Sequence, residues 1–184
     1  MMKLIFDRCF ALFGLVLLFP LLLICWVVAA IDTSSNGLFL QTRIGQYGKP
    51  FTIYKLRTMD SSTHKISSIG AFLRTYKFDE LPQLLNVLQG KMSIVGPRPD
   101  IAGYYDKLIG ENRKILALKP GLTSEAAIKY ANEEQLLSKH DNPLHFNDTV
   151  LFPDKVKLNL AYYYNHTFLG DIIIIWKTFL RIFK

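Results

Sequence analysis

The sequence predicts a small membrane-associated α+β domain, and three observations lead to that fold class. Residues 10–31 are apolar and uncharged, two β-rich runs flank a Gly/Lys/Pro turn, and several helical patterns follow. A chain of 184 residues can bury the core of one domain, or of a small domain with an appendage. Half of the residues are hydrophobic, and the formal net charge of +7 suits an anionic membrane surface, a nucleic acid or a phosphorylated substrate.

The apolar segment "FALFGLVLLFPLLLICWVVAAI" has the length of a helix that spans the hydrocarbon core of a bilayer. Lys3 and Arg8 precede it, so the positive-inside rule keeps the N-terminus in the cytoplasm. A secretory signal peptide is the rival interpretation, because residues 28–30 loosely resemble a cleavage site, but the run is long for a signal. Pro20 predicts a kink near the middle. A kinked helix can span the bilayer or leave on the face it entered, and the residues alone leave both open.

Two β-rich runs follow the apolar segment, at Leu38–Ile44 and Phe51–Met59. The turn residues between them predict a β-hairpin. A Ser/Thr-rich break then leads into a short helical pattern between Ile66 and Tyr76.

The stretch "DELPQLLNVLQG" predicts a further helix, because its leucines follow the i, i+3, i+4, i+7 spacing of one helical face. Asp79 is a good N-cap, Pro82 falls in the first turn, where its missing N–H is harmless, and Gly90 is placed to stop the helix. Asp79 and Glu80 are therefore expected at a helix N-terminus, where the macrodipole and free N–H groups favour negative charge.

Further helices are expected in the second half of the chain. A polar helical region runs towards "LKPGLT", "NEEQLLSKHDNP" is typical of a solvated helix with its loop, and another helix begins after Pro153. In the C-terminal run, Lys177, Arg181 and Lys184 share one helical face opposite Ile, Trp and Phe residues. That profile is typical of a helix lying in the membrane interface, and a C-terminal helix packed on its own domain is the alternative.

The candidate functional groups are an acidic pair and several basic residues. By spacing alone, Asp79 and Glu80 need be no more than the start of a capped helix. Arg98 is more unusual, because the prolines of "GPRP" restrict its backbone and lower the entropy lost when its planar fork binds a phosphate. Three further basic residues lie upstream of it: Lys55, Arg57 and Arg74.

Three motifs carry a resemblance to a known family. They are "FTIYKLRTM", "IGAFLRTYKFDELPQLLNVLQGKMSIVGPRP" and "LKPGLT", in this order behind the proline-broken apolar segment. Together they resemble the small bacterial sugar transferases, the monotopic phosphoglycosyl transferases of glycan assembly. The resemblance covers most of the chain, and "DELPQLLNVLQGKMSIVGPRP" is its most specific part.

The resemblance implies an activity. Such enzymes move a sugar phosphate from a nucleotide diphosphate sugar, usually a UDP-sugar, onto undecaprenyl phosphate. UMP leaves, and a polyprenyl-diphosphate sugar remains in the membrane. This is the initiating membrane step in the synthesis of bacterial surface glycans such as capsule, O-antigen, exopolysaccharide or glycoprotein.

The resemblance also implies roles for single residues. Asp79 matches the nucleophile that forms a covalent aspartyl phosphosugar intermediate, and Mg²⁺ is required. Glu80 matches the second carboxylate of the dyad, which serves as metal ligand or as proton acceptor, so both acids are candidate metal ligands. Arg98 matches the arginine of the family's "GPRP" motif and is expected to bind phosphate. The other expected substrate-binding residues are Lys55, Arg57, Arg74 and Asp171, the last of which matches a recurring family aspartate.

A membrane topology is implied as well. The apolar segment is expected to form a re-entrant helix-break-helix at Pro20, with both ends facing the cytoplasm. Residues 1–32 would then be a membrane anchor. Residues 33–184 would be a catalytic domain on the cytoplasmic face of the bacterial inner membrane, with amphipathic helices and an interfacial C-terminal helix.

The sequence departs from the family pattern at several positions. Lys91 stands where an acidic residue is usual, Ser124 follows "KPGLT" where glycine is common, and Asn159 occupies a position that is often aspartate. These changes leave the sugar and the glycan pathway unassigned.

Two other function classes agree less well with the sequence. A non-catalytic membrane adaptor could lose a dyad carboxylate without cost, whereas this chain retains Asp79, Glu80 and Arg98 together. Nucleic-acid binding rests on charge alone, lacks a recognition-helix or stacking module and conflicts with the apolar segment. Besides UDP-sugar, undecaprenyl phosphate and membrane lipid, the partners include no nucleic acid, and a homodimer is left open.

Overall fold

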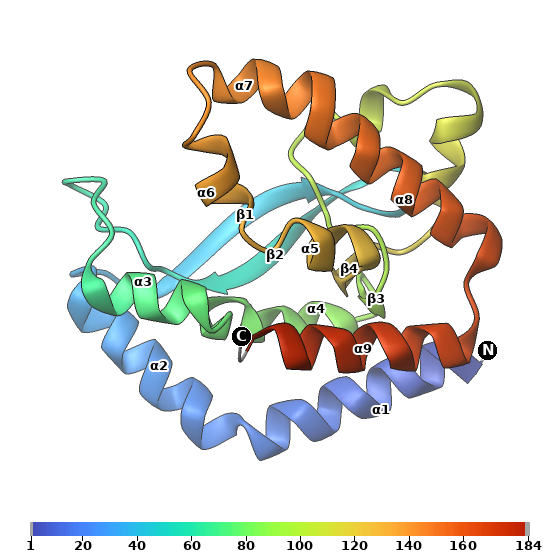
Figure 1. Ribbon diagram of the computed structural model, residues 1–184. Helices are drawn as coiled ribbons and strands as arrows, with labels where there is room; N and C mark the ends of the chain where they lie inside the picture. The colour runs from blue at the N-terminus through green and yellow to red at the C-terminus, as the bar shows by residue number, and fades with distance from the viewer. Residues whose placement is uncertain (1, 183–184) are drawn as a thin grey trace. The chain divides into compact units, whose positions relative to one another are not determined.

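The computed structural model describes residues 2–182, which divide into two compact units. The first contains residues 2–43 and 50–93, and the second contains residues 44–49 and 94–181. Both units combine helices with short strands (Figure 1), in agreement with the predicted α+β class.

The first unit opens with two apolar helices, α1 (Met2–Leu17) and α2 (Phe19–Asp32), which meet at a bend of 67° (Figure 1). The break falls at Leu18, just before Pro20. Proline has no N–H to donate to the carbonyl of Val16, and its ring clashes with that carbonyl. The helix therefore cannot continue straight through this point.

Within residues 2–182, no single helix is long and apolar enough to cross a membrane. Only α1 and α2 together, as a bent pair, meet the length and composition of a membrane segment. Large apolar side chains are exposed along both helices, among them Phe13, Val16, Leu17, Phe19 and Ile24.

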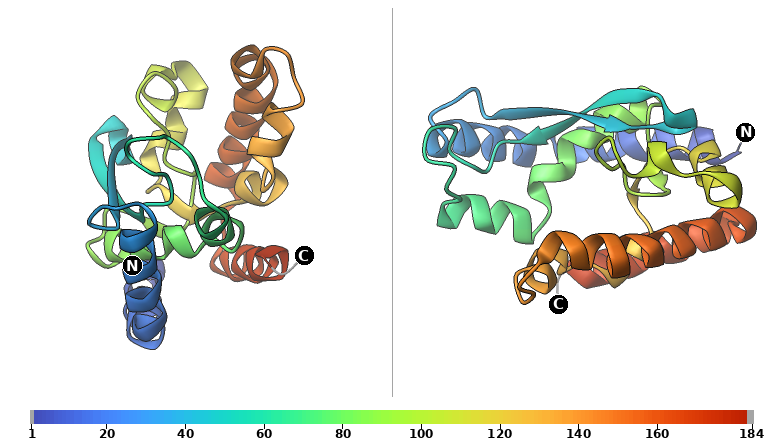
Figure 2. Two further views of the ribbon diagram at one scale, coloured as in Figure 1. Left: turned by 90° about the vertical axis from the view of Figure 1, so that its left-hand side faces the viewer. Right: turned by 90° about the horizontal axis from the view of Figure 1, so that it is seen from above.

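The predicted hairpin is present. Strand β1 (Leu38–Ile44) has the predicted bounds, and β2 (Pro50–Leu56) pairs with it to form a long ribbon (Figure 2). The second strand ends before the predicted Met59. That residue forms an isolated bridge with Ile66 instead, which closes the Ser/Thr-rich loop between them.

Three short helical elements complete the first unit: α3 (Ser68–Thr75), the 3-10 helix η2 (Phe78–Gln83) and α4 (Leu84–Leu88). The predicted helix with Asp79 as N-cap is wrong in its start and in its type. Lys77 adopts a left-handed conformation (φ 59°) and precedes η2, so Asp79 lies inside the first turn. The 3-10 helix η2 begins directly after this left-handed residue.

The core of the first unit joins α2 to β2 and α3. Its buried side chains are Cys25, Ala29, Leu56 and Leu73, and Phe78 of η2 packs against them. Helix α1 packs on α4, where Gly14 lies so close to Leu84 that a Cβ at this glycine would come within 3.3 Å of the leucine side chain.

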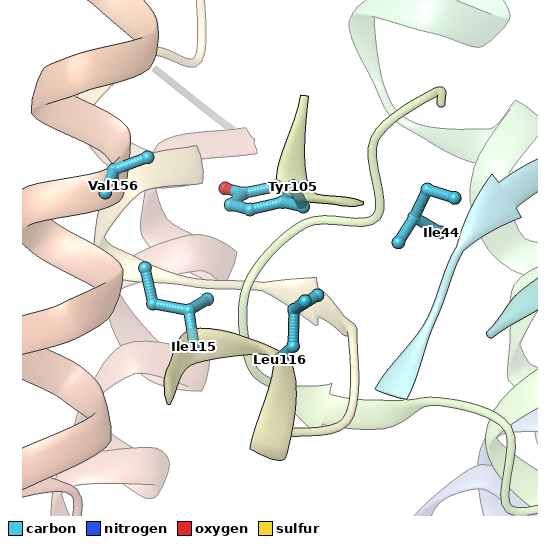
Figure 3. Close-up of a cluster of buried hydrophobic side chains, with 5 residues drawn as sticks. All are labelled: Ile44, Tyr105, Ile115, Leu116 and Val156. Atoms are coloured by element: carbon cyan, nitrogen blue, oxygen red, sulfur yellow. The ribbon is translucent and has the colours of Figure 1, made fainter. Parts of the chain in front are cut away.

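The core of the second unit contains Ile44, Tyr105, Ile115, Leu116 and Val156 (Figure 3). These side chains come from the end of β1, from the 3-10 helices η3 (Tyr105–Lys107) and η4 (Gly110–Ala117), and from α8 (Phe152–Asn165). The polar helical region predicted here is thus built from 3-10 turns, and α8 begins next to Pro153, as expected.

The remaining elements of the second unit surround this core. They are η1 (Gln46–Gly48), β3 (Ser93–Val95), β4 (Gly121–Thr123), α5 (Glu125–Lys129), α6 (Glu133–Leu137), α7 (Pro143–Phe146) and the π-helical turn η5 (Asn147–Leu151). Strands β3 and β4 pair with each other. The charged segment predicted to be a solvated helix forms α6, which contains no buried residue.

One face of the last helix, α9 (Phe168–Ile182), contacts other parts of the second unit. Ile174 is buried, and the hydroxyls of Thr178 and Thr123 are hydrogen-bonded at 2.6 Å. Lys177 forms an ion pair with Glu125 at 2.9 Å. Of the three basic residues predicted to share a face of this helix, Lys184 lies outside the described residues.

Candidate active site

The two acids of the expected dyad, Asp79 and Glu80, lie in the first turn of η2 and are 7% and 9% exposed. The first N–H groups of a helix have no partner within it, and its dipole favours negative charge at this end. The local backbone is therefore favourable to carboxylates, although neither acid is the N-cap. Two adjacent, nearly buried carboxylates are costly unless positive groups or hydrogen bonds compensate them.

Lys55 provides such compensation for Glu80. Its Nζ lies 3.1 Å from Oε1 of Glu80, and the two side chains are 17% and 11% exposed. The lysine is on β2 and the glutamate on η2, so the ion pair links the hairpin to the acidic turn. The structure thus brings together two of the residues that the sequence analysis selected.

Asn86 fixes the position of β2 against the acidic segment. Its Oδ1 accepts a hydrogen bond from the N–H of Tyr54 at 3.1 Å, and its Nδ2 donates to the carbonyl of Thr52 at 2.8 Å. The side chain thereby pairs with the free edge of β2 as a neighbouring strand would. Because Tyr54 precedes Lys55, these bonds also place the lysine. Sequence reasoning missed this role, since Asn86 looked like a polar residue within an amphipathic helix.

The other two basic residues that the sequence analysis selected in the first unit, Arg57 and Arg74, lie next to the end of β2. Arg74 of α3 donates from Nε to the hydroxyl of Thr58 at 2.8 Å. Gly70 allows this approach, because a Cβ there would lie only 2.3 Å from the carbonyl oxygen of Thr58. The guanidinium of Arg57 is 5.8 Å from the centre of the Phe39 ring, a distance at which a cation–π attraction operates.

A buried acid in α1 was not singled out from the sequence. Asp7 is 4% exposed and accepts a hydrogen bond from the hydroxyl of Ser93 at 2.7 Å. The only signal was a charge just ahead of the apolar run. The bond ties the first helix to the end of the acidic segment, directly before the "IVGPRP" stretch.

The "GPRP" and "KPGLT" motifs meet back to back in the second unit. Gly96 donates its N–H to the carbonyl of Thr123 at 3.0 Å, and Gly121 donates to the carbonyl of Pro97 at 2.8 Å. A Cβ at Gly121 would lie 2.2 Å from the backbone nitrogen of Gly96, a separation too short for any side chain. The close approach of the two motifs therefore requires a glycine in each of them. The sequence spacing of the motifs did not reveal this contact.

Arg98 is half-buried and lines a cavity of about 20 Å³, which has room for one water molecule. Its neighbours Pro97 and Pro99 and the ring of Tyr105 also line this cavity. The hydroxyl of Tyr105 accepts a hydrogen bond from Nδ2 of Asn159 at 2.8 Å. Burial is the main cause that raises the pKa of Tyr105, so its ring stays neutral at physiological pH.

Asp171, expected to contact substrate, is only 2% exposed. Its Oδ1 accepts a hydrogen bond from the hydroxyl of Tyr162 at 2.5 Å. The contact joins the end of α8 to the first turn of α9, on opposite sides of a short connection.

Two of the three departures from the family pattern have local partners. Lys91 is exposed, Ser124 caps α5 by accepting a hydrogen bond from the N–H of Ala127 at 3.0 Å, and Asn159 donates to Tyr105. An aspartate at position 159 could not donate an N–H to this hydroxyl. The serine and the asparagine are therefore consistent with the local structure of the second unit.

The acid pair is also the best candidate for binding a divalent metal. Among residues 2–182, no three His, Cys, Asp or Glu side chains are grouped as a complete ligand set. Magnesium ordinarily takes only one or two protein carboxylates and completes its shell with water and substrate phosphates. Asp79 and Glu80 fit that use, although Lys55 competes with a cation for Oε1 of Glu80.

Comparison with known proteins identifies the family. The chain is 32% identical to the uncharacterized sugar transferase EpsL of Bacillus subtilis, over 96% of this chain and 85% of that protein. It is 39% identical to the UDP-glucose:undecaprenyl-phosphate glucose-1-phosphate transferase of Caulobacter vibrioides, over 60% of this chain and 47% of that protein. The Escherichia coli transferase of the same name is 35% identical, over 77% of this chain and 34% of that protein.

The chain thus spans less than half the length of these two glucose-1-phosphate transferases. The family model described as bacterial sugar transferase matches residues 1–184. The chain therefore belongs to the bacterial sugar transferases, a family of sugar-phosphate transferases.

Proposed function

We propose that this enzyme transfers a sugar phosphate from a UDP-sugar to undecaprenyl phosphate and releases UMP. The family membership supports the reaction class, and the names of the relatives from Caulobacter vibrioides and Escherichia coli contain both substrates. The observation that carries the proposal is the nearly buried pair Asp79 and Glu80 at the start of η2, with Lys55 bound to the second acid. The product would be the first lipid-linked sugar of a surface glycan.

We assign the role of nucleophile to Asp79. A carboxylate oxygen of Asp79 would attack the phosphorus that bears the sugar, and the bond from that phosphorus to the bridging oxygen of UMP would break. UMP leaves with the bridging oxygen and the electron pair. An oxygen of undecaprenyl phosphate then attacks the same phosphorus, and the Asp79 carboxylate is regenerated. The position in the first helical turn favours both the ionised acid and an approaching phosphate.

Other residues would assist this chemistry in different ways. Lys55 holds Glu80 and adds positive charge close to the incoming phosphates. Glu80 would accept a proton from the lipid phosphate or bind the cation. A bound Mg²⁺, held by Asp79 and Glu80, would supply charge neutralisation between the anionic nucleophile and the anionic diphosphate. Arg98 would bind phosphate oxygens through its planar fork.

We propose further that α1 and α2 form a re-entrant anchor in the bacterial inner membrane, with the catalytic part on the cytoplasmic face. The bend of 67° at Pro20 and the exposed apolar surface support this topology. The outward surface of α9 supports its placement in the membrane interface, because it exposes Leu169, Trp176 and Phe179 while Lys177 is bound to Glu125.

The reaction is tested with the purified full chain in detergent or nanodiscs. Incubated with a panel of UDP-sugars and Mg²⁺ but no lipid acceptor, the enzyme should release UMP and gain the mass of one sugar phosphate, mapped to Asp79. Asp79→Asn should abolish the adduct and keep the fold, because the side-chain volume is retained. Glu80→Gln should be strongly impaired, with a trace of adduct if Glu80 serves only the second step. If UMP appears only when undecaprenyl phosphate is present, the lipid attacks directly and the proposed nucleophile is wrong.

A further inference from the structure

We propose that the carboxamide of Gln83 is a substrate-contacting group, whose Nε2 donates a hydrogen bond to a phosphate oxygen. The inference rests on the proposed function and extends it by one residue. Gln83 is the last residue of η2, the 3-10 helix that carries Asp79 and Glu80. The sequence motif gave it no role of its own.

The first argument is the burial of Gln83 without a hydrogen bond. The residue is 3% exposed, and within residues 2–182 its carboxamide makes no hydrogen bond to protein. A carboxamide carries two N–H donors and an acceptor oxygen. Among the described residues, the amide atoms of Gln83 are not counted with the fully buried N and O atoms that lack a partner, so they keep a small contact with solvent. A nearly buried amide with no partner in the protein is unusual, because most buried polar side chains are paired. A ligand that arrives during the reaction would supply the partner.

Asn86 provides a contrast three residues further along the chain. It is fully buried, but its carboxamide bonds with Thr52 and Tyr54 at 2.8 and 3.1 Å. The amide of Asn86 thus stabilises the fold, and its two hydrogen bonds compensate for its removal from water. Gln83 has no such structural use, so the fold alone gives no reason for an amide at its position.

The second argument is the face on which Gln83 lies. In a 3-10 helix, residues three apart lie directly above one another along the axis, which places Gln83 on the same face as Glu80. That face is also the one reached by Nζ of Lys55. A neutral amide beside the acid pair can donate a hydrogen bond to phosphate. It adds no further charge to a site that already contains negative carboxylates and the positive Lys55.

Phosphate is the chemistry that the two substrates share. The diphosphate of the nucleotide sugar and the phosphate of the polyprenyl acceptor must each approach Asp79. A carboxamide N–H is a donor that either phosphate can use. The two half-reactions distinguish which of them binds Gln83.

The test compares Gln83→Met with Gln89→Met. Methionine keeps the length of glutamine and removes its polar group, and Gln89 is an exposed glutamine of the same segment. For Gln83→Met, we expect a half-reaction rate reduced about tenfold to hundredfold, the scale of a lost hydrogen bond to a charged group. Its thermal midpoint should not fall, because the amide has no partner within the described protein to lose. Gln89→Met should change neither quantity.

Two assays separate the sources of phosphate. A slower release of UMP without lipid assigns Gln83 to the nucleotide sugar, and a slower transfer from preformed adduct to polyprenyl phosphate assigns it to the acceptor. Gln83→Glu should be impaired at least as strongly as Gln83→Met, since a carboxylate cannot donate to phosphate and repels it. If Gln83→Met retains both half-reactions within about twofold, or Gln83→Glu behaves as wild type, the inference is wrong.

A binding measurement keeps the inference separate from the proposed function. The thermal midpoint is recorded for wild type and Gln83→Met with UDP and, separately, with a short-chain polyprenyl phosphate. One of the two should stabilise the wild type more than the variant. A wild-type protein that releases no UMP from any UDP-sugar overturns the proposed function. Equal stabilisation of both proteins by both ligands overturns the role of Gln83 alone.

Discussion

Nζ of Lys55 lies 3.1 Å from Oε1 of Glu80, and this ion pair joins the second strand of the hairpin to the acidic turn. Both side chains are largely shielded from water, so the attraction between them is less screened than at an open surface. The pair also has a supporting framework. Asn86 bonds to the backbone on either side of Ile53, and this fixes the register of β2 next to the lysine.

Lys55→Met is expected to lower both stability and activity. Without the ammonium, the nearly buried Glu80 loses its ion-pair partner, at a cost of about 1–3 kcal/mol in the free energy of unfolding. The rate of UMP release should fall roughly tenfold or more, because positive charge near the phosphates is also lost. Urea unfolding in detergent and an assay of UMP measure the two effects.

A double-mutant cycle assigns these losses to the pair. Glu80→Gln combined with Lys55→Met should unfold with less than the sum of the two single losses, since the residues are in direct contact. Additive losses of stability would show that the pair contributes nothing beyond its separate side chains.

Gly121→Ala is expected to disrupt the junction between the "GPRP" and "KPGLT" motifs. The added Cβ would lie 2.2 Å from the backbone nitrogen of Gly96, and backbone on both sides leaves no room to adjust. The free energy of unfolding should fall by about 3 kcal/mol or more. Gly170→Ala is the matched control, because its Cβ would meet only the hydroxyl of Thr167, at 3.1 Å. A junction variant as stable as this control would contradict the contact.

Arg98→Lys is expected to impair catalysis although the charge is kept. Lysine cannot bridge two phosphate oxygens with a planar fork, and the two flanking prolines restrict the position from which it must reach. The loss of kcat/KM should be about tenfold or more, which corresponds to about 1.4 kcal/mol of transition-state stabilisation. Normal kinetics of the lysine variant would show that Arg98 serves the loop around the small cavity rather than the substrate.

Local patterns in the sequence predicted part of the fold well. The bounds of β1 followed from a β-rich run and its turn, and the break in the apolar helix followed from Pro20, because each depends on neighbouring residues only. The start of η2, which carries the acid pair, could not be predicted from such local patterns. It depends on the left-handed conformation of Lys77, which a lysine seldom adopts and which no side-chain pattern indicates.

In the candidate site, too, local features could be predicted and contacts between distant segments could not. The acid pair and Arg98 were found through the motif that contains them. The partners that hold them come from distant segments: Lys55 for Glu80, and Gly121 for the loop of Arg98. Gln83 was overlooked for a different reason. A glutamine is ordinary in a helix, and only its burial without a hydrogen bond in the folded chain sets it apart.

The membrane topology gives the last prediction. If α1 and α2 enter and leave the bilayer on one side, the residues before α1 and after α2 face the same compartment. Met2 and Ser34 are exposed at these two ends, and the side chain of Ser34 makes no hydrogen bond within the described residues. By contrast, the hydroxyl of neighbouring Ser35 is engaged with Thr33. Ser34 is therefore the better site for a probe.

Single cysteines are introduced as Met2→Cys and Ser34→Cys into a chain in which Cys9 and Cys25 are replaced by alanine. Met1, which precedes the substituted position, is kept unchanged. In intact cells, a membrane-impermeant maleimide should label neither cysteine, and both should react after the cells are opened. Ser138→Cys, in the exposed segment after α6, reports the compartment of the catalytic part and should follow the other two. A spanning helix predicts the opposite pattern: Ser34→Cys and Ser138→Cys would react in intact cells while Met2→Cys stays protected. That result would place Asp79 on the face away from cytoplasmic nucleotide sugar, and the proposed function would have to be abandoned together with the re-entrant anchor.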